Sequence, residues 1–312
     1  MRWIQKLTGL LILFLSANVL FCQELVTKDQ EDQIVSTLEG FLENSGKAIN
    51  YAVAIDFTSW DLEGKNLGEP TVLRGEVVIY LSEVDKFRRV TYWREVVNEG
   101  VVVEQPWRTE LTRKGVISTP TIRGSEPAIS YSFLASFDPL EIAAGTYTAF
   151  GESACKTGYF MSKVDIKNVL SCKSDANGNL SFVSQLWPDC QMSTTCSRKQ
   201  GGMPVRTSTR LSMDMKSGRL KATKRIPEYN FLLCETLAKW ENIGELWVPT
   251  WVQMDKIYGV GKSETKRRYE FELRWVVGDG LDKLDKKRFE SNDLKIEPLM
   301  FEEVRKAALP RP

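Results

Sequence analysis

The sequence predicts a mainly β protein (α+β), built on a large curved antiparallel sheet or half-barrel with a few covering helices. Three observations support this prediction. Several segments alternate apolar and polar residues with a period of two, as strands with one buried and one solvated face do. Polar turns such as Arg113-Lys114-Gly115 separate neighbouring segments, as in β-hairpins. Clear helical periodicity is confined to one long stretch near the N-terminus.

The first 22 residues predict a signal peptide. Arg2 and Lys6 supply a basic start, and an apolar run from Leu7 to Phe21 follows it. This run is shorter than the roughly 20 residues that a transmembrane helix needs. The alternative is a buried helix of a cytosolic fold, but such a helix carries a polar stripe that this run lacks. Export is therefore the favoured interpretation.

Residues 23–312 are expected to form one mature domain, because no internal repeat and no low-complexity linker divides them. No second long apolar run follows the signal, so we expect a periplasmic or secreted protein without a transmembrane segment in the mature chain. A lipid anchor at Cys22 is the less favoured alternative. The preceding Phe21 is bulky, whereas lipoprotein signals carry small residues before the cysteine.

A helix is expected from about Lys28 to Asn44, with Thr27 as its N-cap. Packing against the sheet is the simplest role for its apolar stripe. The residues of this stripe recur at helical spacing and are Ile34, Leu38, Phe41 and Leu42.

After this helix the period changes to two, which predicts consecutive strands joined by hairpins. Polar stretches separate these segments, and β-branched and aromatic residues are frequent within them. The expected strands are Tyr51–Phe57, Val72–Leu81, Phe87–Val97, Trp107–Thr112 and Val116–Thr119.

The middle of the chain, about residues 125–202, is less regular and carries four of the cysteines. Asp138-Pro139-Leu140-Glu141 is typical of the start of a short helix, since proline is tolerated in a first helical turn. The rest of this segment is expected to form long connections with short strands.

Export makes disulfides possible in the cysteine-bearing segment. The candidate pairs are Cys155–Cys172 and Cys190–Cys196, each closing a short loop, although spacing alone does not fix the connectivity. Cys234 lies in an apolar run and is expected to stay reduced.

Two later segments alternate most regularly, and each presents one apolar face. The first carries Val205, Thr207, Thr209, Leu211, Met213 and Met215 on that face. The second carries Tyr269, Phe271, Leu273, Trp275 and Val277. A short helix is expected near the end of the chain, from Pro298 to Ala308.

The sequence contains no histidine, which is the usual general base near neutral pH and the commonest metal ligand. Ser-His-Asp and Cys-His catalysis and histidine-containing metal sites are therefore excluded. We expect no enzymic activity, no metal and no cofactor, with a hydrolase built on two carboxylates as the remaining enzymic alternative. The formal charge of +1 indicates no nucleic-acid partner, since such proteins need a clustered basic surface.

One segment imitates part of a phosphate-binding loop. Gly259 to Ser263 has the glycine, lysine and serine that end such a loop, but the glycine required earlier is replaced by Lys256. The segment that follows is charged instead of forming an apolar helix. We interpret it as a glycine turn between strands.

Another segment imitates a calcium loop. Asp175, Asn177 and Asn179 have the right spacing, but Leu180 and Leu186 stand where such a loop needs glycine and glutamate. We interpret Asn177-Gly178 as a hairpin turn.

The order of these elements resembles that of the outer-membrane lipoprotein carrier (LolA-like) superfamily. A signal peptide leads into a helix, long antiparallel strands follow, a late strand carries Trp247-Val248-Pro249, and a strongly alternating strand leads toward the chain end. The resemblance is one of architecture, and it carries over no site residue. It implies a curved, unclosed half-barrel that helices cover on the concave side and that holds acyl chains or other apolar ligands.

Two functions from different classes are expected. The first is an exported, non-catalytic protein that binds an apolar ligand, or a lipid or lipoprotein acyl chain, in a half-barrel groove. The second is a secreted structural or protein-interaction β-domain with a filled core, and the sequence names no protein partner for it. The residues expected to line an apolar site are Leu211, Met213, Phe271, Leu273 and Trp275, which would serve equally as ordinary core.

Overall fold

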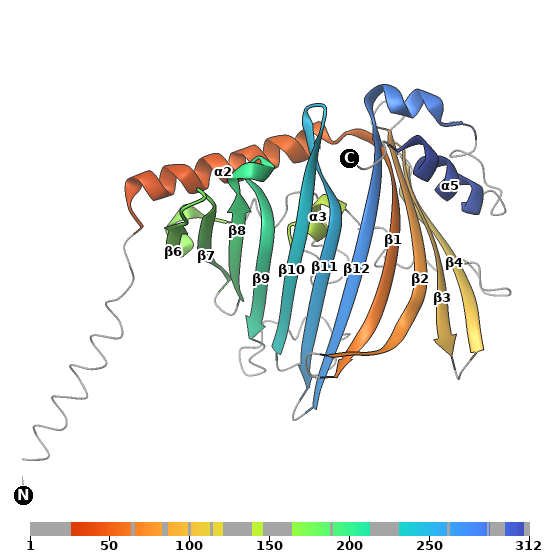
Figure 1. The fold of residues 1–312 in the computed structure, drawn as a ribbon, viewed down its shortest axis with the longest axis horizontal. Helices are drawn as coiled ribbons and strands as arrows, with labels where there is room; N and C mark the ends of the chain where they lie inside the picture. The colour runs from red at the N-terminus through yellow and green to blue at the C-terminus, as the bar shows by residue number, and fades with distance from the viewer. Residues whose placement is uncertain are drawn as a thin grey trace, which may run out of the picture.

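The computed structural model describes residues 26–63, 66–82, 87–98, 101–112, 115–120, 139–145, 164–187, 190–212, 231–260, 263–285, 287 and 297–308. Within these residues, twelve strands form one antiparallel sheet that is curved and open (Figure 1). The predicted fold class, a mainly β protein with a large curved antiparallel sheet and a few helices, is confirmed. The strands are β1 (Asn50–Glu63), β2 (Asn66–Ser82), β3 (Phe87–Asn98), β4 (Val101–Thr112), β5 (Gly115–Pro120), β6 (Val169–Ser174), β7 (Leu180–Trp187), β8 (Cys190–Ser197), β9 (Met203–Ser212), β10 (Phe231–Ile243), β11 (Leu246–Val260) and β12 (Ser263–Val277).

The sheet consists of two meanders that meet in its middle. Its order is β5-β4-β3-β2-β1-β12-β11-β10-β9-β8-β7-β6, so β1 to β5 run outward on one side and β6 to β12 run inward on the other. Strands β1 and β12 form the junction, in a register from Tyr51 opposite Val277 to Asp61 opposite Arg267. The five strands expected between Tyr51 and Thr119 are confirmed as β1 to β5.

Helix α2 (Lys28–Lys47) begins where the sequence predicts and ends about one turn later than expected. Thr27 and Gln30 form a capping box at its start. The Gln30 backbone N–H donates to the Thr27 hydroxyl at 3.3 Å, and the Thr27 N–H donates to Gln30 Oε1 at 2.9 Å. Phe41 is buried, whereas Leu42 is 37% exposed, so the packing stripe is narrower than predicted.

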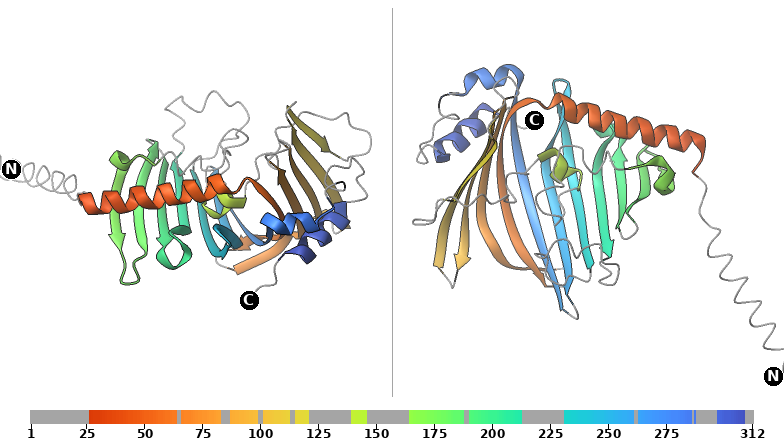
Figure 2. Two further views of the ribbon diagram at one scale, coloured as in Figure 1. Left: turned by 90° about the horizontal axis from the view of Figure 1, so that it is seen from above. Right: turned by 180° about the vertical axis from the view of Figure 1, so that it is seen from behind.

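Hydrogen bonds fix α2 to the sheet near both of its ends. At the start, Gln30 Nε2 donates to the backbone carbonyl of Cys172 in β6 at 3.1 Å. Near the other end, Asn44 donates to the Trp247 carbonyl of β11 and accepts from the Trp247 N–H, both at 2.8 Å. The helix therefore crosses the strand ends of the β6–β11 half of the sheet (Figure 2).

The strand residues alternate between two faces of the sheet. The inner face carries Tyr51 and Val53 of β1, and α2 and α3 (Pro139–Ala143) contribute to its core. The outer face carries Ala52 and Ala54, and α5 (Glu297–Ala307) packs on it over β1, β2 and β12 together with η6 (Gly278–Lys283). Helices therefore pack on both faces, and the short helix expected near the chain end is confirmed as α5.

Residues 169–197 of the cysteine-bearing segment form the three strands β6 to β8. Short 3₁₀ turns, η3 (Ile166–Asn168) and η4 (Arg198–Gln200), precede β6 and follow β8. The helix start expected at Pro139 is confirmed, because α3 begins there.

Candidate functional site

The inner face of the sheet is apolar across its central strands. In register, Phe57 of β1 lies opposite Phe271 of β12, Phe271 lies opposite Val252 of β11, and Val252 lies opposite Ala238 of β10. All four side chains are at most 8% exposed, and the rings of Phe57 and Phe271 lie 5.9 Å apart. Since neighbouring strands are about 4.8 Å apart, this row alone extends an apolar surface over about 14 Å.

Three of the five residues expected at an apolar site lie together on this face. Phe271, Leu273 and Trp275 follow each other at every second position of β12, and each is 3% exposed. Leu211 belongs to β9, which β10 and β11 separate from β12, and nothing is described of its side chain. Met213 lies outside the described residues. The site expected from sequence is therefore described only at β12.

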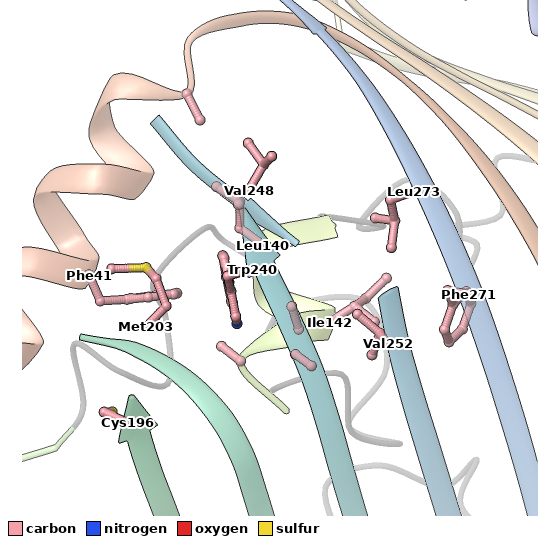
Figure 3. Packing of buried hydrophobic residues seen from close by; sticks show 14 of the residues in the cluster. Phe41, Leu140, Ile142, Cys196, Met203, Trp240, Val248, Val252, Phe271 and Leu273 are labelled. Atoms are coloured by element: carbon pink, nitrogen blue, oxygen red, sulfur yellow. The ribbon is translucent and has the colours of Figure 1, made fainter. Parts of the chain in front are cut away.

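The two inner-face tryptophans near α2 are held in fixed orientations. Trp275 Nε1 donates to the carbonyl of Pro249, and Trp240 Nε1 donates to the carbonyl of Pro204, both at 2.7 Å. Phe41 of α2 packs edge-on against Trp240, with 6.2 Å between the ring centroids. Figure 3 shows Phe41, Trp240, Leu140 and Val248 converging beneath the helices. This end of the inner face forms part of the packed core.

A charged row crosses the inner face farther along the strands, away from α2. Lys256 of β11 continues the inner-face positions Val252 and Met254, yet it is only 4% exposed. Its Nζ lies 5.5 Å from the centroid of the Tyr269 ring. In register it lies opposite Cys234 of β10 and Arg267 of β12.

Arg267 of this row pairs with a carboxylate. Its Nε donates to Asp61 Oδ1 of β1 at 2.9 Å, and both side chains are more than a third exposed. Burial is the largest single cause and works to lower the pKa of Arg267, but the hydrogen bonds and charge interactions with Asp61 and Tyr269 together hold that pKa above its ordinary value.

Buried threonines lie beside this charged row. Thr209 of β9 lies opposite Cys234, and Thr207 of β9 lies opposite Thr194 of β8. Thr194, Thr207 and Thr209 are at most 2% exposed, and within the described part of the chain their hydroxyl oxygens have no hydrogen-bond partner. Burying a hydroxyl without a partner costs about 1–3 kcal/mol. These hydroxyls are therefore polar groups that the described protein leaves unused.

The outer face carries an ion pair of a structural kind. Arg268 of β12 donates to Asp255 of β11 through Nε and Nη2, with both distances 2.7 Å. The hydrogen bond to Asp255 raises the pKa of Arg268. This fork joins two neighbouring strands directly, so it ties β11 to β12.

No disulfide forms among the cysteines that the structure describes as free. Cys172, Cys196 and Cys234 are free and buried, and Cys155 lies outside the described residues. Cys190 and Cys196 lie at opposite ends of the extended strand β8, which separates them by about 20 Å. A disulfide needs Cα atoms within about 7 Å, so the pair Cys190–Cys196 was a wrong prediction.

The calcium-like segment is a hairpin turn, as predicted. Asp175 Oδ1 accepts from the backbone N–H groups of Asn177 and Asn179, at 2.8 and 2.9 Å, and Gly178 adopts a φ of 74°. The Asn179 N–H bond holds the pKa of Asp175 below its ordinary value. Val260 and Ser263, which belong to the phosphate-loop imitation, pair at the β11–β12 hairpin.

The sequence analysis missed that Lys256 and the threonines beside it are buried on the inner face. The sequence did contain a signal for Lys256. Val252, Met254 and Lys256 occupy every second position, so in a strand their side chains lie on the same face. Lys256 was read only as the residue that breaks a phosphate-loop pattern. In the part of the chain that the structure describes, no three Cys, Asp or Glu side chains gather in a metal-binding arrangement.

The geometry defines a class of protein, a curved open antiparallel sheet with helices packed on its apolar inner face. No protein-family model and no curated protein matches the sequence. A DUF1329 family protein from Desulfovibrio piger has a similar structure, with 7% identity and a TM-score of 0.31 over 81% of this chain and 98% of that one. A domain from Vibrio parahaemolyticus described as an outer membrane lipoprotein-sorting protein has 9% identity and a TM-score of 0.34 over 83% and 100%.

LprF from Mycobacterium bovis is a third similar structure, with 9% identity and a TM-score of 0.26 over 78% of this chain and 91% of that one. These TM-scores are too low to indicate more than a resemblance of general architecture. None of the described helices is long and apolar enough to cross a membrane.

Proposed function

We propose that the protein is an exported, non-catalytic carrier that binds an apolar ligand, such as a lipid or lipoprotein acyl chain, on the inner face of its sheet. The observation that carries this proposal is the continuous apolar surface from Phe57 across Phe271 and Val252 to Ala238. The signal-like N-terminal sequence supports a periplasmic or secreted location.

Energetics favour an acyl chain as the ligand. Each buried methylene contributes about 0.8 kcal/mol, so a long chain laid along the β11 and β12 inner-face residues gains enough to bind in the micromolar range or tighter. The extended strand from Val248 to Lys256 spans about 27 Å. This length accommodates a long acyl chain without bending it.

A matched pair of variants tests the proposal. Ala238 lies on the inner face and its neighbour Leu237 lies exposed on the outer face. Ala238→Trp places a bulky indole on the inner face beside Val252, where the proposed ligand would lie, so it is expected to weaken acyl-chain binding at least tenfold, whereas Leu237→Trp leaves it unchanged. Binding is measured by tryptophan fluorescence during titration with a long-chain fatty acid, and by native mass spectrometry of freshly purified protein. Thermal unfolding and near-UV circular dichroism verify that both variants fold.

A second candidate function is a structural or protein-interaction β-domain with a filled core. The near-complete burial of Phe271, Leu273 and Trp275 favours it, because ordinary core residues have this environment. The titration separates the two candidates. No saturable bound species in either measurement, together with an intact fold, would establish the structural domain and exclude the carrier.

A further inference from the structure

The solvent-facing side of α2 is an acidic surface. The helix carries five acidic and two basic residues, which gives it a net charge of −3. Glu31, Asp32 and Glu39 are exposed and form no ion pair with any residue that the structure describes. Val35 and Leu42 are 38% and 37% exposed. At 3.6 residues per turn these five side chains fall within about 100° around the helix, so acidic and apolar groups share one surface.

A basic surface lies on the outer face of the sheet at β9 and β10. Arg206 and Arg210 are exposed on the same face of β9, and within the described residues neither has an ion-pair partner. Leu237 of β10 lies opposite Arg206 in register and is 39% exposed. This surface therefore also places an apolar side chain beside its charges.

The neighbouring residues leave this surface basic. Lys239 follows on the same face of β10 and is exposed, with its Nζ 5.1 Å from the centroid of the Trp251 ring. Glu235 is half-buried on that face, and Asp255 of β11 is already paired with Arg268. Counting the two arginines of β9 with Lys239 and Glu235, the surface has a net charge of +2.

The two surfaces match in charge and in spacing. Glu31 and Glu39 are about 12 Å apart along α2, and Arg206 and Arg210 are about 13 Å apart along β9. Within one chain α2 packs on the inner face, so it does not meet the outer face of its own sheet. Two α2 helices from different copies would place like charges together, which disfavours that contact. Each chain thus carries both halves of a contact that only two copies can make.

We propose that α2 of one copy of the protein binds the outer face of β9 and β10 on another copy. Arg206 and Arg210 oppose the acidic residues of α2, and Leu237 packs against Leu42. The contact joins two different surfaces, so it is heterologous, and each copy in a pair keeps one surface free for the next. The protein is therefore expected to assemble beyond a dimer. The contact uses no inner-face residue, so it stands or falls separately from the carrier function.

Analytical ultracentrifugation over a range of protein concentrations tests the contact. The native protein is expected to form oligomers whose association constant falls at least tenfold between about 0.05 M and about 1 M salt, because salt screens interactions between exposed charges. A protein that stays monomeric at every concentration overturns the proposal. Association that does not respond to salt overturns it as well.

An exchange of charges locates the contact. Arg206→Glu/Arg210→Glu makes both surfaces acidic, and Glu31→Lys/Glu39→Lys makes both basic, so each variant alone is expected to be monomeric. An equimolar mixture is expected to associate again, because each variant then offers the charge that the other lacks. A mixture that stays monomeric while the native protein associates contradicts the assigned surfaces. Circular dichroism and thermal unfolding verify that both variants fold.

Lys173→Glu is the matched control for Arg206→Glu. Lys173 is also exposed on the outer face, but it belongs to β6, three strands away from β9. Arg206→Glu is expected to weaken association several-fold and Lys173→Glu to leave it unchanged, whereas equal effects would show that only the net charge matters. An anionic membrane is the alternative occupant of the basic surface. If the native protein is monomeric and binds vesicles that contain phosphatidylserine, and Arg206→Glu/Arg210→Glu does not bind them, the proposal is wrong.

Discussion

At the scale of single residues, burial controls the chemistry of the three described thiols. Cys172, Cys196 and Cys234 are all buried, and desolvation is the largest cause that raises the pKa of each. For Cys196 the pKa rises to about 12, and for Cys234 the nearby charge of Lys256 works in the opposite direction. The reactive form of cysteine is the thiolate, so these thiols are inert near neutral pH.

This burial predicts how stability depends on pH. The folded protein holds the pKa of Cys196 near 12, above its ordinary value of 9.0, so the unfolded chain loses this proton first as pH rises. The contribution of Cys196 to stability is therefore complete below pH 9.0 and is lost between there and about pH 12. Urea unfolding of the native protein and of Cys196→Val is compared at neutral pH and near pH 10.5. The native protein is expected to lose more stability than the variant, and parallel losses would contradict this assignment.

At the scale of elements, two tight turns show how the backbone conformation and a neighbouring side chain can each require glycine. Gly201 follows η4 with a φ of +64°, and a Cβ there would overlap the indole of Trp247. Gly244 has a similar φ of +68° in the β10–β11 hairpin, with nothing near the position of a Cβ. Both turns need glycine for their backbone, but only Gly201 also needs it for space.

These two glycines form a matched pair. Gly244→Ala is expected to destabilise the protein by about 1 kcal/mol, the cost of an alanine in the left-handed region. Gly201→Ala adds the displacement of Trp247 and is expected to cost about 1–3 kcal/mol more, as overpacking does. Chemical denaturation measures both free energies of unfolding. If the two variants are equally stable, the Trp247 side chain can move away from the new alanine at no cost in free energy. The short distance between residue 201 and Trp247 would then not be what requires glycine.

Local sequence signals were enough to predict those elements whose stabilising residues lie close together in the sequence. Thr27 and Gln30 lie three residues apart, so the start of α2 could be read directly, and Asn177-Gly178 likewise specifies its own turn. The prediction of a Cys190–Cys196 disulfide was wrong because it took a short sequence spacing as proximity in space. Such proximity requires the chain to turn, and β8 stays extended between the two cysteines. The charged row was missed because Asp61 reaches Arg267 only through the pairing of β1 with β12, two strands that are far apart in sequence.

The whole molecule depends on the junction of its two meanders. Strands β1 and β12 pair in the middle of the sheet, and each is paired on both sides, whereas β5 and β6 stand at the ends of the strand order. Apolar residues of both faces are buried over β1, since the inner-face core includes Val53 and the outer-face core includes Ala54. The junction is therefore expected to be the most stable part of the sheet.

Hydrogen exchange followed by mass spectrometry tests this expectation. Peptides from β1 and β12 are expected to exchange slowest, through global unfolding, whereas peptides from β5 and β6 exchange earlier through local opening. Exchange in β12 as fast as in β6 would show that the two meanders separate before they unfold. Peptides from β8 and β9, which are paired on both sides but lie away from the junction, serve as the internal comparison.

The pairing of β1 with β12 also sets the order in which the protein can be completed during synthesis. Tyr51 of β1 pairs with Val277 of β12, so more than two hundred further residues must be synthesised after Tyr51 before this junction can form. Until then one edge of β1 offers unpaired backbone groups and an apolar face to any other strand, which is a hazard for aggregation. For this protein, protecting the free edge of β1 until β12 has been made is as much a requirement as the stability of the finished sheet.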